Sequence, residues 1–355
     1  MPSSARNLPF FALTTAGLEA LSAKEIALLP HVSIKGTTYR RISANYSGPL
    51  EPLLSLRTVD DVFLEVATWT EIGRPRSVLE KLRSLSARLD LHDAAECCAA
   101  LRSIHNQPPF SVSVSFVGKR NYTSEEIKNV IAQEIERTHG WTYQQDDRAA
   151  DLNVRLFLEH ETAIVGVRLG KTALHDRWYQ QVHLPGALKP SVAAALVLLA
   201  QTEATMTILD PCCGSGTILI EVALQGANAC GGDNNPLALA ATRTNSSAAG
   251  VPVCVRCWDA QALPLADSSV DRVICNLPWG HQVQVEGTLT ALYRQIVVEM
   301  RRVLAPAGRI VLLANTPQKV DPLDLCRIQQ FEISLFGQRP TILVLAHPQT
   351  GCQYS

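Results

Sequence analysis

Two short segments of the chain carry residues whose types and spacing could do chemistry. Residues 210–217 read Asp-Pro-Cys-Cys-Gly-Ser-Gly-Thr, and residues 276–279 read Asn-Leu-Pro-Trp. Gly214 and Gly216 lie where a strand should turn into a helix, and a side chain at either position would push away a ligand lying across the turn. The first segment therefore predicts a site for a nucleotide-like cofactor, and the second predicts a clamp for an amino nitrogen.

The pattern around the glycines favours S-adenosylmethionine over a dinucleotide. A GxGxxG turn would need a third glycine at position 219, where Leu219 stands. A helix N-terminus favours the carboxylate of a methionyl tail, and Asp210 would lie beneath its amino group. The predicted cofactor-binding residues are Asp210, Cys212, Gly214, Gly216, Thr217, Asp233, Asn234, Asp259, Ala260 and Asn276.

Two acidic residues in this set have alternative interpretations. Asp233 ends the next expected strand, where a carboxylate can accept hydrogen bonds from both ribose hydroxyls. It could instead cap the helix that begins at Pro236. Asp259 could accept from the adenine amino group, with the Ala260 amide lining the adenine pocket, or it could be a loop cap.

The second segment is suited to positioning an amino group rather than to base catalysis. The amide oxygen of Asn276 and the carbonyl of Leu277 can each accept one hydrogen of the amine, while Trp279 stacks on the ring that bears it. Asn276 cannot take a proton at neutral pH. The dipoles of its amide and of the Leu277 carbonyl would therefore act by stabilising the positive charge that passes to the amine nitrogen. A chance Asn-X-Pro turn is the alternative. The predicted catalytic residues are Asn276, Leu277, Pro278 and Trp279.

The second half of the chain, from about Leu188, should position both segments. Short apolar runs alternate there with helical patterns, which predicts an α/β domain with a mostly parallel sheet. The expected strands are residues 207–210, 227–233, 253–257, 270–275, 310–314, 331–336 and 341–346. The expected helices are residues 217–225, 236–249 and 289–303, and the apolar run 193–200 should be a buried helix.

The first half has an α+β pattern. Residues 110–116 alternate strictly between apolar and polar, and Thr123 with Glu126 forms a capping box that opens a helix to about Thr138. A hairpin should join two strands near residues 159–161. The expected strands are residues 10–13, 62–68, 110–116, 151–158 and 162–169, and the other expected helices are residues 15–27 and 76–89.

The composition excludes several classes of protein. The chain has 355 residues, 46% of them hydrophobic, and a net charge of −1, which indicates a soluble protein of two or three domains. Residues 1–190 carry 22 Lys+Arg against 21 Asp+Glu, and residues 191–355 carry 10 Lys+Arg against 12 Asp+Glu. Because neither half has a large net positive charge, RNA would have to be bound by local patches of basic residues. With no apolar run of membrane length and no secretory signal at residues 1–7, we expect a cytoplasmic protein without a membrane partner.

The ten cysteines are scattered along the chain. Only Cys254 and Cys257 have metal-like spacing, and no second pair or nearby histidine completes a four-ligand zinc site. Because residues 253–257 also fit a short buried strand, we expect reduced thiols and no metal.

The order of these parts resembles the THUMP-domain RNA methyltransferases. The match is carried by residues 210–217, by residues 276–279 and by residues 174–190, which are similar to the family's linker with its Arg, Tyr and apolar helix. Gln180 stands where the family usually has an Arg after that Tyr. Leu277 also differs from the family's usual residue, but this position acts through its backbone carbonyl. The resemblance implies a ferredoxin-like region at 1–75, a THUMP domain at 76–171, a linker at 172–190 and a class I methyltransferase domain at 191–355.

Five residues are candidates for contact with RNA, because cations beside aromatic rings suit phosphate binding and stacking. Each of them alone is more often a solvated side chain. His281, after the clamp, could contact substrate or be a surface histidine. The five candidates are Arg177, Tyr179 and Lys189 in the linker and Lys119 and Arg120 before the capping box.

The residues themselves predict only methylation of an amino nitrogen. The resemblance adds the substrate: an S-adenosylmethionine-dependent methyltransferase acting on N2 of guanine in tRNA. The alternatives are N6-adenine methylation of RNA or DNA, glutamine methylation, and an RNA-binding protein with a vestigial methyltransferase domain. Some relatives in this broad group need a small activator subunit, and the sequence leaves that open.

Overall fold

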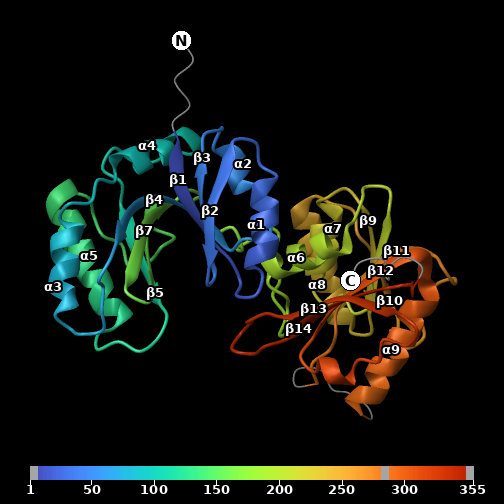
Figure 1. The fold of residues 1–355 in the computed structure, drawn as a ribbon. Coiled ribbons are helices and arrows are strands. Elements are labelled where there is room, and N and C mark those ends of the chain that lie inside the picture. Colours follow the sequence, from blue (N-terminus) through green and yellow to red (C-terminus); the bar gives the residue numbers. More distant parts are fainter. Residues whose placement is uncertain (1–6, 281–287, 349–355) are drawn as a thin grey trace. The chain divides into compact units, whose positions relative to one another are not determined.

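The computed structural model describes residues 7–280 and 288–348, which divide into two compact units (Figure 1). Unit 1 takes the described residues up to Thr14 and Glu19–Leu174. Unit 2 takes Thr15–Leu18 and the described residues from His175 onward. The predicted boundary at residue 75 falls inside unit 1, so the assignment of separate ferredoxin-like and THUMP domains stays a prediction.

Unit 1 is built on one mixed seven-stranded sheet in the order β2-β3-β1-β4-β7-β6-β5, in which only β5 and β6 pair in parallel. Its strands are β1 (Leu8–Leu13), β2 (Val32–Thr38), β3 (Arg41–Tyr46), β4 (Asp61–Trp69), β5 (Phe110–Phe116), β6 (Leu152–Glu159) and β7 (Thr162–Arg168). Its helices are α1 (Glu19–Ala27), α2 (Glu51–Leu54), α3 (Val78–Ser86), α4 (His92–Leu101) and α5 (Ser124–His139).

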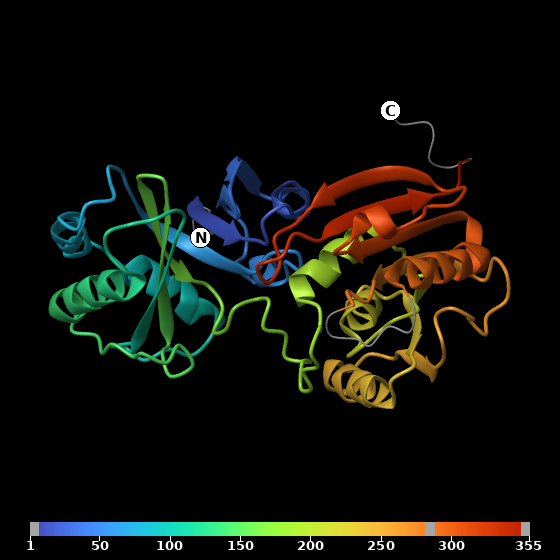
Figure 2. The same cartoon turned by 90° about the horizontal axis from the view of Figure 1, so that it is seen from below.

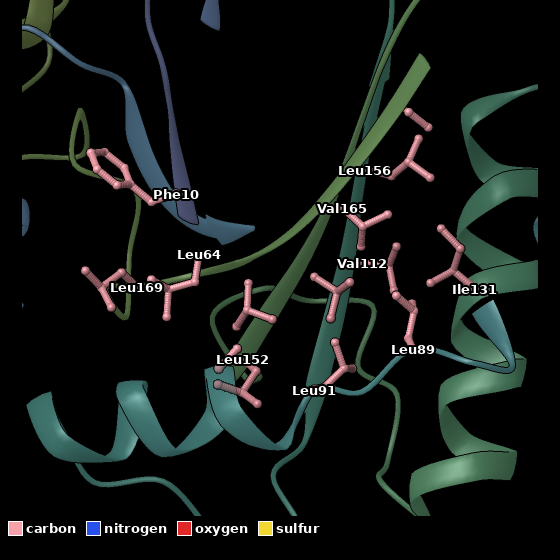
Figure 3. Close-up of a cluster of buried hydrophobic side chains, with 14 of the residues drawn as sticks. Phe10, Leu64, Leu89, Leu91, Val112, Ile131, Leu152, Leu156, Val165 and Leu169 are labelled. Carbon is pink, nitrogen blue, oxygen red and sulfur yellow. The ribbon is translucent and has the colours of Figure 1, made fainter. Parts of the chain in front are cut away.

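The core of unit 1 lies between its sheet and its helices. Helices α3 and α5 lie side by side, and α5 packs on β5 (Figure 1). Figure 3 shows Val112 and Val165 of the sheet turned toward the same core as Ile131 of α5, with Phe10 and Leu64 further along it. The predicted capping box is present, since Glu126 N–H donates to Thr123 Oγ1 and Thr123 N–H donates to a Glu126 carboxylate oxygen.

Unit 2 is an α/β unit with a seven-stranded sheet in the order β10-β9-β8-β11-β12-β14-β13. Its strands are β8 (Thr207–Asp210), β9 (Asn228–Asp233), β10 (Cys254–Cys257), β11 (Val270–Asn276), β12 (Leu304–Ala314), β13 (Cys326–Glu332) and β14 (Thr341–Ala346). Its helices are α6 (Pro190–Ala200), α7 (Thr217–Ala223), α8 (Pro236–Ala249), α9 (Leu289–Val303) and the short 3-10 helix η1 (Pro317–Lys319).

The strands of unit 2 run in parallel from β10 to β12, β14 runs in the opposite direction, and the edge strand β13 runs in the direction of the first five again. Strand β14 pairs antiparallel with both β12 and β13. These three strands are drawn in orange to red in Figure 2. Because β10, β9, β8 and β11 are neighbours and parallel, their carboxyl ends share one edge of the sheet. That edge is where the two chemically informative segments lie.

Several sequence-based expectations were wrong in detail. The strand expected at residues 331–336 is β13, which ends at Glu332, because Leu335 and Gln338 exchange backbone hydrogen bonds that close a turn. The strand expected to be buried at 253–257 is the edge strand β10, where Cys254 and Cys257 are exposed. The helix expected at 15–27 begins only at Glu19. Strands β2 and β3 and helices α2 and α4 were not anticipated.

Within residues 7–280 and 288–348, no helix is long and apolar enough to cross a bilayer. The same residues contain no cluster of three or more His, Cys, Asp or Glu side chains arranged to hold a metal ion.

Candidate active site

The predicted cofactor residues end four neighbouring strands of unit 2. Asp210 is the last residue of β8, Asp233 the last of β9 and Asn276 the last of β11, while Asp259 lies two residues beyond β10. The structure therefore brings together, at one edge of a sheet, residues that are far apart in sequence. Trp258 strengthens this edge, because its indole N–H donates to the Pro211 carbonyl at 3.1 Å.

The glycine turn, residues 213–216, connects β8 to α7. Both glycines have positive φ, +54° for Gly214 and +83° for Gly216. A Cβ on Gly216 would lie 2.5 Å from Cγ2 of Thr242, so close packing against α8 requires glycine there. A Cβ on Gly214 would meet nothing within 4 Å, so the turn faces open space at that residue.

Asp210 is a buried carboxyl beneath this turn. One of its oxygens accepts the backbone N–H of Cys212 at 3.2 Å, and only 1% of the residue is exposed. Burial raises the pKa of Asp210 to about 8, and the nearby Asp233 carboxylate adds to the increase. Burial therefore favours the neutral form of this carboxyl, and a cation beside it would favour the charged form.

Asp233 joins the ends of two strands. One carboxylate oxygen accepts the Gly214 N–H at 3.0 Å and the other accepts the Asn235 N–H at 2.9 Å. The side chain that caps α8 is that of Asn235, which accepts from Leu237 N–H at 3.0 Å, so the alternative of Asp233 as the helix cap is wrong.

The remaining cofactor candidates differ in exposure. Asp259 is exposed and accepts the Gln261 N–H at 2.9 Å, which matches the loop-cap interpretation. It also lines a surface hollow of about 390 Å³ against α9. Thr217 and Ala260 are buried, Cys212 is half-buried and Asn234 is exposed.

The clamp segment, residues 276–279, is held by one hydrogen bond within it and by two to neighbouring parts of unit 2. The indole N–H of Trp279 donates to the amide oxygen of Asn276 at 3.1 Å, the Leu277 N–H donates to the Leu313 carbonyl at 3.0 Å, and the Tyr293 hydroxyl donates to the Pro278 carbonyl at 2.8 Å. The amide oxygen of Asn276 thus faces the Trp279 ring edge. His281 lies outside the described residues.

Two of the predicted RNA contacts are buried instead. Arg177 is 7% exposed and Tyr179 is 0% exposed. Both bond the buried carboxylate of Glu221 on α7, through Arg177 Nε at 3.1 Å and the Tyr179 hydroxyl at 2.7 Å. The expectation that these two side chains contact RNA is therefore corrected: they hold the joining segment, residues 175–189, against α7. The exposed side chain between them is Trp178, at 58%.

The other three RNA candidates lie in different settings. The guanidinium of Arg120 donates to the carbonyls of Ile72 at 2.9 Å and Gly73 at 3.1 Å, so it braces loops of unit 1 rather than presenting its charge to solvent. Lys119 beside it is exposed. Lys189 is half-buried at the start of α6.

Comparisons with known proteins decide the family. Residues 177–332 match the model of the RMKL-like methyltransferase domain. A tRNA (guanine(6)-N2)-methyltransferase of Thermus thermophilus is 30% identical over 252 residues, which cover 68% of this chain and 73% of that protein. The chain belongs to the RMKL-like methyltransferase family. The cofactor of such class I methyltransferases is S-adenosylmethionine, in agreement with the cofactor predicted from residues 210–217.

Two further relatives extend this result. A mouse tRNA (guanine(6)-N(2))-methyltransferase is 30% identical over 224 residues, which cover 58% of this chain but 44% of the mouse protein. The chain thus spans less than half the length of that relative. The crystal structure of TrmN from Thermus thermophilus matches with a TM-score of 0.78 and 26% identity, covering 96% of this chain and 99% of that one. The predicted class I methyltransferase fold is confirmed.

Proposed function

We propose that this methyltransferase transfers a methyl group from S-adenosylmethionine to N2 of a guanine in tRNA. The observation that carries the proposal is the shared sheet edge, where Asn276 ends the strand next to the one that leads into the glycine turn. A clamp for an amino group thus adjoins a turn that faces open space at Gly214. Guanine N2 and tRNA come from the names of the relatives.

The residues of the edge fit this cofactor. Gly214 leaves room beside the turn, and Asp210 is a buried carboxyl whose raised pKa indicates that a cation would stabilise its charged form. We assign Asp210 to the methionyl ammonium and Asp233, with Asn234, to the ribose. When bound, S-adenosylmethionine supplies an electrophilic methyl group.

The clamp would act by orientation and by its dipoles. Asn276 and the Leu277 carbonyl each accept one N–H of the guanine amine, which fixes the direction of the nitrogen lone pair. These oxygens stabilise the positive charge that grows on nitrogen, and the proton leaves to water afterwards. The Trp279 ring stacks on the base.

Cofactor affinity should depend on pH through Asp210. An ammonium group binds the ionised carboxylate, so binding must release the proton that Asp210 carries below its pKa of about 8. The affinity for S-adenosylhomocysteine should therefore fall by up to about tenfold for each pH unit below 8. Calorimetric titrations at pH 6, 7 and 8 would measure this decrease, and Asp210→Asn should remove it. An affinity that is constant over this range would exclude the assignment.

RNA should be held largely outside the catalytic sheet, because residues 191–355 carry only 10 Lys+Arg against 12 Asp+Glu. Within unit 2, the joining segment offers Trp178 as an aromatic surface, in place of the buried Tyr179. Its ring lies edge-on to the Tyr179 ring, with centroids 5.8 Å apart. Lys119 and Lys189 remain candidates for phosphate contact.

Trp178→Ala should raise the KM for tRNA about fivefold to a hundredfold, the effect of losing one stacked base. The KM for S-adenosylmethionine should not change, since the substitution leaves Glu221 and its partners in place. Trp178→Phe, which keeps an aromatic face, should retain most of the affinity. Equal tRNA KM values in Trp178→Ala and the parent would remove Trp178 from the RNA surface.

The reaction itself is tested with purified protein, unmodified tRNA and S-adenosylmethionine. Mass spectrometry of the digested nucleosides should show N2-methylguanosine, and Asn276→Ala serves as the negative control. N6-methyladenosine in its place would support the adenine alternative. The absence of any methylated nucleoside would support a vestigial domain or a missing activator subunit. Adding candidate subunits to the assay would distinguish these two explanations. A tRNA substrate agrees with the cytoplasmic location predicted from the sequence, which stays a prediction.

A further inference from the structure

Helix α8 presents two buried polar side chains to the glycine turn. Thr242 and Asn245 are three residues apart, which places them on one face of the helix. The Thr242 hydroxyl donates to the Gly214 carbonyl at 2.8 Å, and Asn245 Nδ2 donates to the Ser215 carbonyl at 3.1 Å. Two consecutive carbonyls of the turn are therefore fixed by side chains of the next helix.

Asn245 also binds the joining segment. Its amide oxygen accepts the N–H of Gln181 at 3.0 Å and of Val182 at 2.9 Å, and Nδ2 donates to the Val182 carbonyl at 3.0 Å. With 2% of its surface exposed, Asn245 makes four hydrogen bonds without competition from solvent. One side chain thus connects the glycine turn to the segment that carries Trp178.

We infer that Thr242 and Asn245 are positioning residues that hold the glycine turn in its cofactor-binding conformation, and that Asn245 ties this conformation to the joining segment. The inference rests on the proposed role of the turn in binding S-adenosylmethionine. The turn needs such support because Gly214 and Gly216 both have positive φ, and glycine residues have many other conformations open to them. Hydrogen bonds from a packed helix restrict the turn to one of them.

The test measures binding of S-adenosylhomocysteine by calorimetry, together with KM and kcat, in the full chain. Asn245→Asp keeps the oxygen that accepts from residues 181 and 182 but loses the amide N–H groups that donate to the carbonyls of Ser215 and Val182. Thr242→Val loses the hydroxyl but keeps the methyl group that packs on Gly216. Each should weaken S-adenosylhomocysteine binding and raise the S-adenosylmethionine KM at least about tenfold, while kcat at saturating S-adenosylmethionine changes less than about threefold.

Two controls separate positioning from stability. Thr242→Ser restores the hydroxyl and should recover most of the affinity. Ser246→Ala removes a hydroxyl of the same helix whose hydrogen bond, among the described residues, goes to the Arg243 carbonyl at 3.1 Å, and this variant should leave affinity unchanged. If Asn245→Asp and Thr242→Val melt at lower temperature but bind like the parent, the inference is overturned. If the parent itself does not bind S-adenosylhomocysteine, the proposed function fails instead.

Discussion

Asn276→Ala should lower the methylation rate at least about a hundredfold while the affinity for S-adenosylhomocysteine stays within about twofold of the parent. The loss concerns the amide oxygen, which is one of two acceptors for the guanine amine. The backbone of the turn is not affected, because Asn276 bonds Trp279 and makes no side-chain bond to residues 213–216 among the described contacts. Single-turnover kinetics with saturating tRNA would isolate the chemical step.

Two variants sharpen this test. Asn276→Asp keeps an acceptor oxygen at the same place and should retain more activity than Asn276→Ala. Trp279→Phe keeps an aromatic face but removes the N–H that now bonds Asn276 at 3.1 Å, so its effect separates stacking from orientation of the amide. A parallel fall of affinity and rate in Asn276→Ala would mean that Asn276 supports the loop rather than the substrate.

Arg177→Met should lower the free energy of unfolding of unit 2 by about 3–5 kcal/mol, because it removes the guanidinium that pairs with the buried carboxylate of Glu221. Glu221 is 0% exposed, so water cannot replace the guanidinium. Tyr179→Phe, which removes one hydrogen bond to the same carboxylate, should cost about 1.5–3 kcal/mol. Urea denaturation followed by circular dichroism would give both values.

The double variant Arg177→Met with Glu221→Leu provides the control. Replacing a buried ion pair by apolar side chains of similar volume is often neutral or stabilising, so the double variant should be more stable than Arg177→Met alone. If Arg177→Met unfolds like the parent and loses only tRNA affinity, the arginine contacts RNA as the sequence had suggested, and the buried arrangement is wrong.

Local patterns were sufficient for most of the catalytic sheet. Strands β8 and β14 and helices α8 and α9 begin and end at the expected residues, since apolar runs and caps such as Asn235 are encoded within a few neighbouring positions. Strand β2 escaped prediction because it is almost entirely exposed and alternates between apolar and polar residues only over residues 32–35. Its pairing with β3 is made by the backbone.

The network around the turn could not be predicted from the sequence. Asn245 lies more than sixty residues from the backbone groups that it binds at positions 181 and 182, and no spacing rule connects them. The Arg-Trp-Tyr sequence at 177–179 did signal a special segment. Which of the three side chains faces solvent, however, was set by Glu221 on α7, and this partner is distant in the chain.

The brevity of β10 bears on how the protein behaves in concentrated solution. This strand forms one open edge of the catalytic sheet, yet it has only four residues and exposes Arg256. An edge so short and positively charged gives another chain few backbone groups to pair with and a charge to desolvate. The parallel sheet can therefore end next to the cofactor residues without offering a template for strand-by-strand aggregation during synthesis and storage.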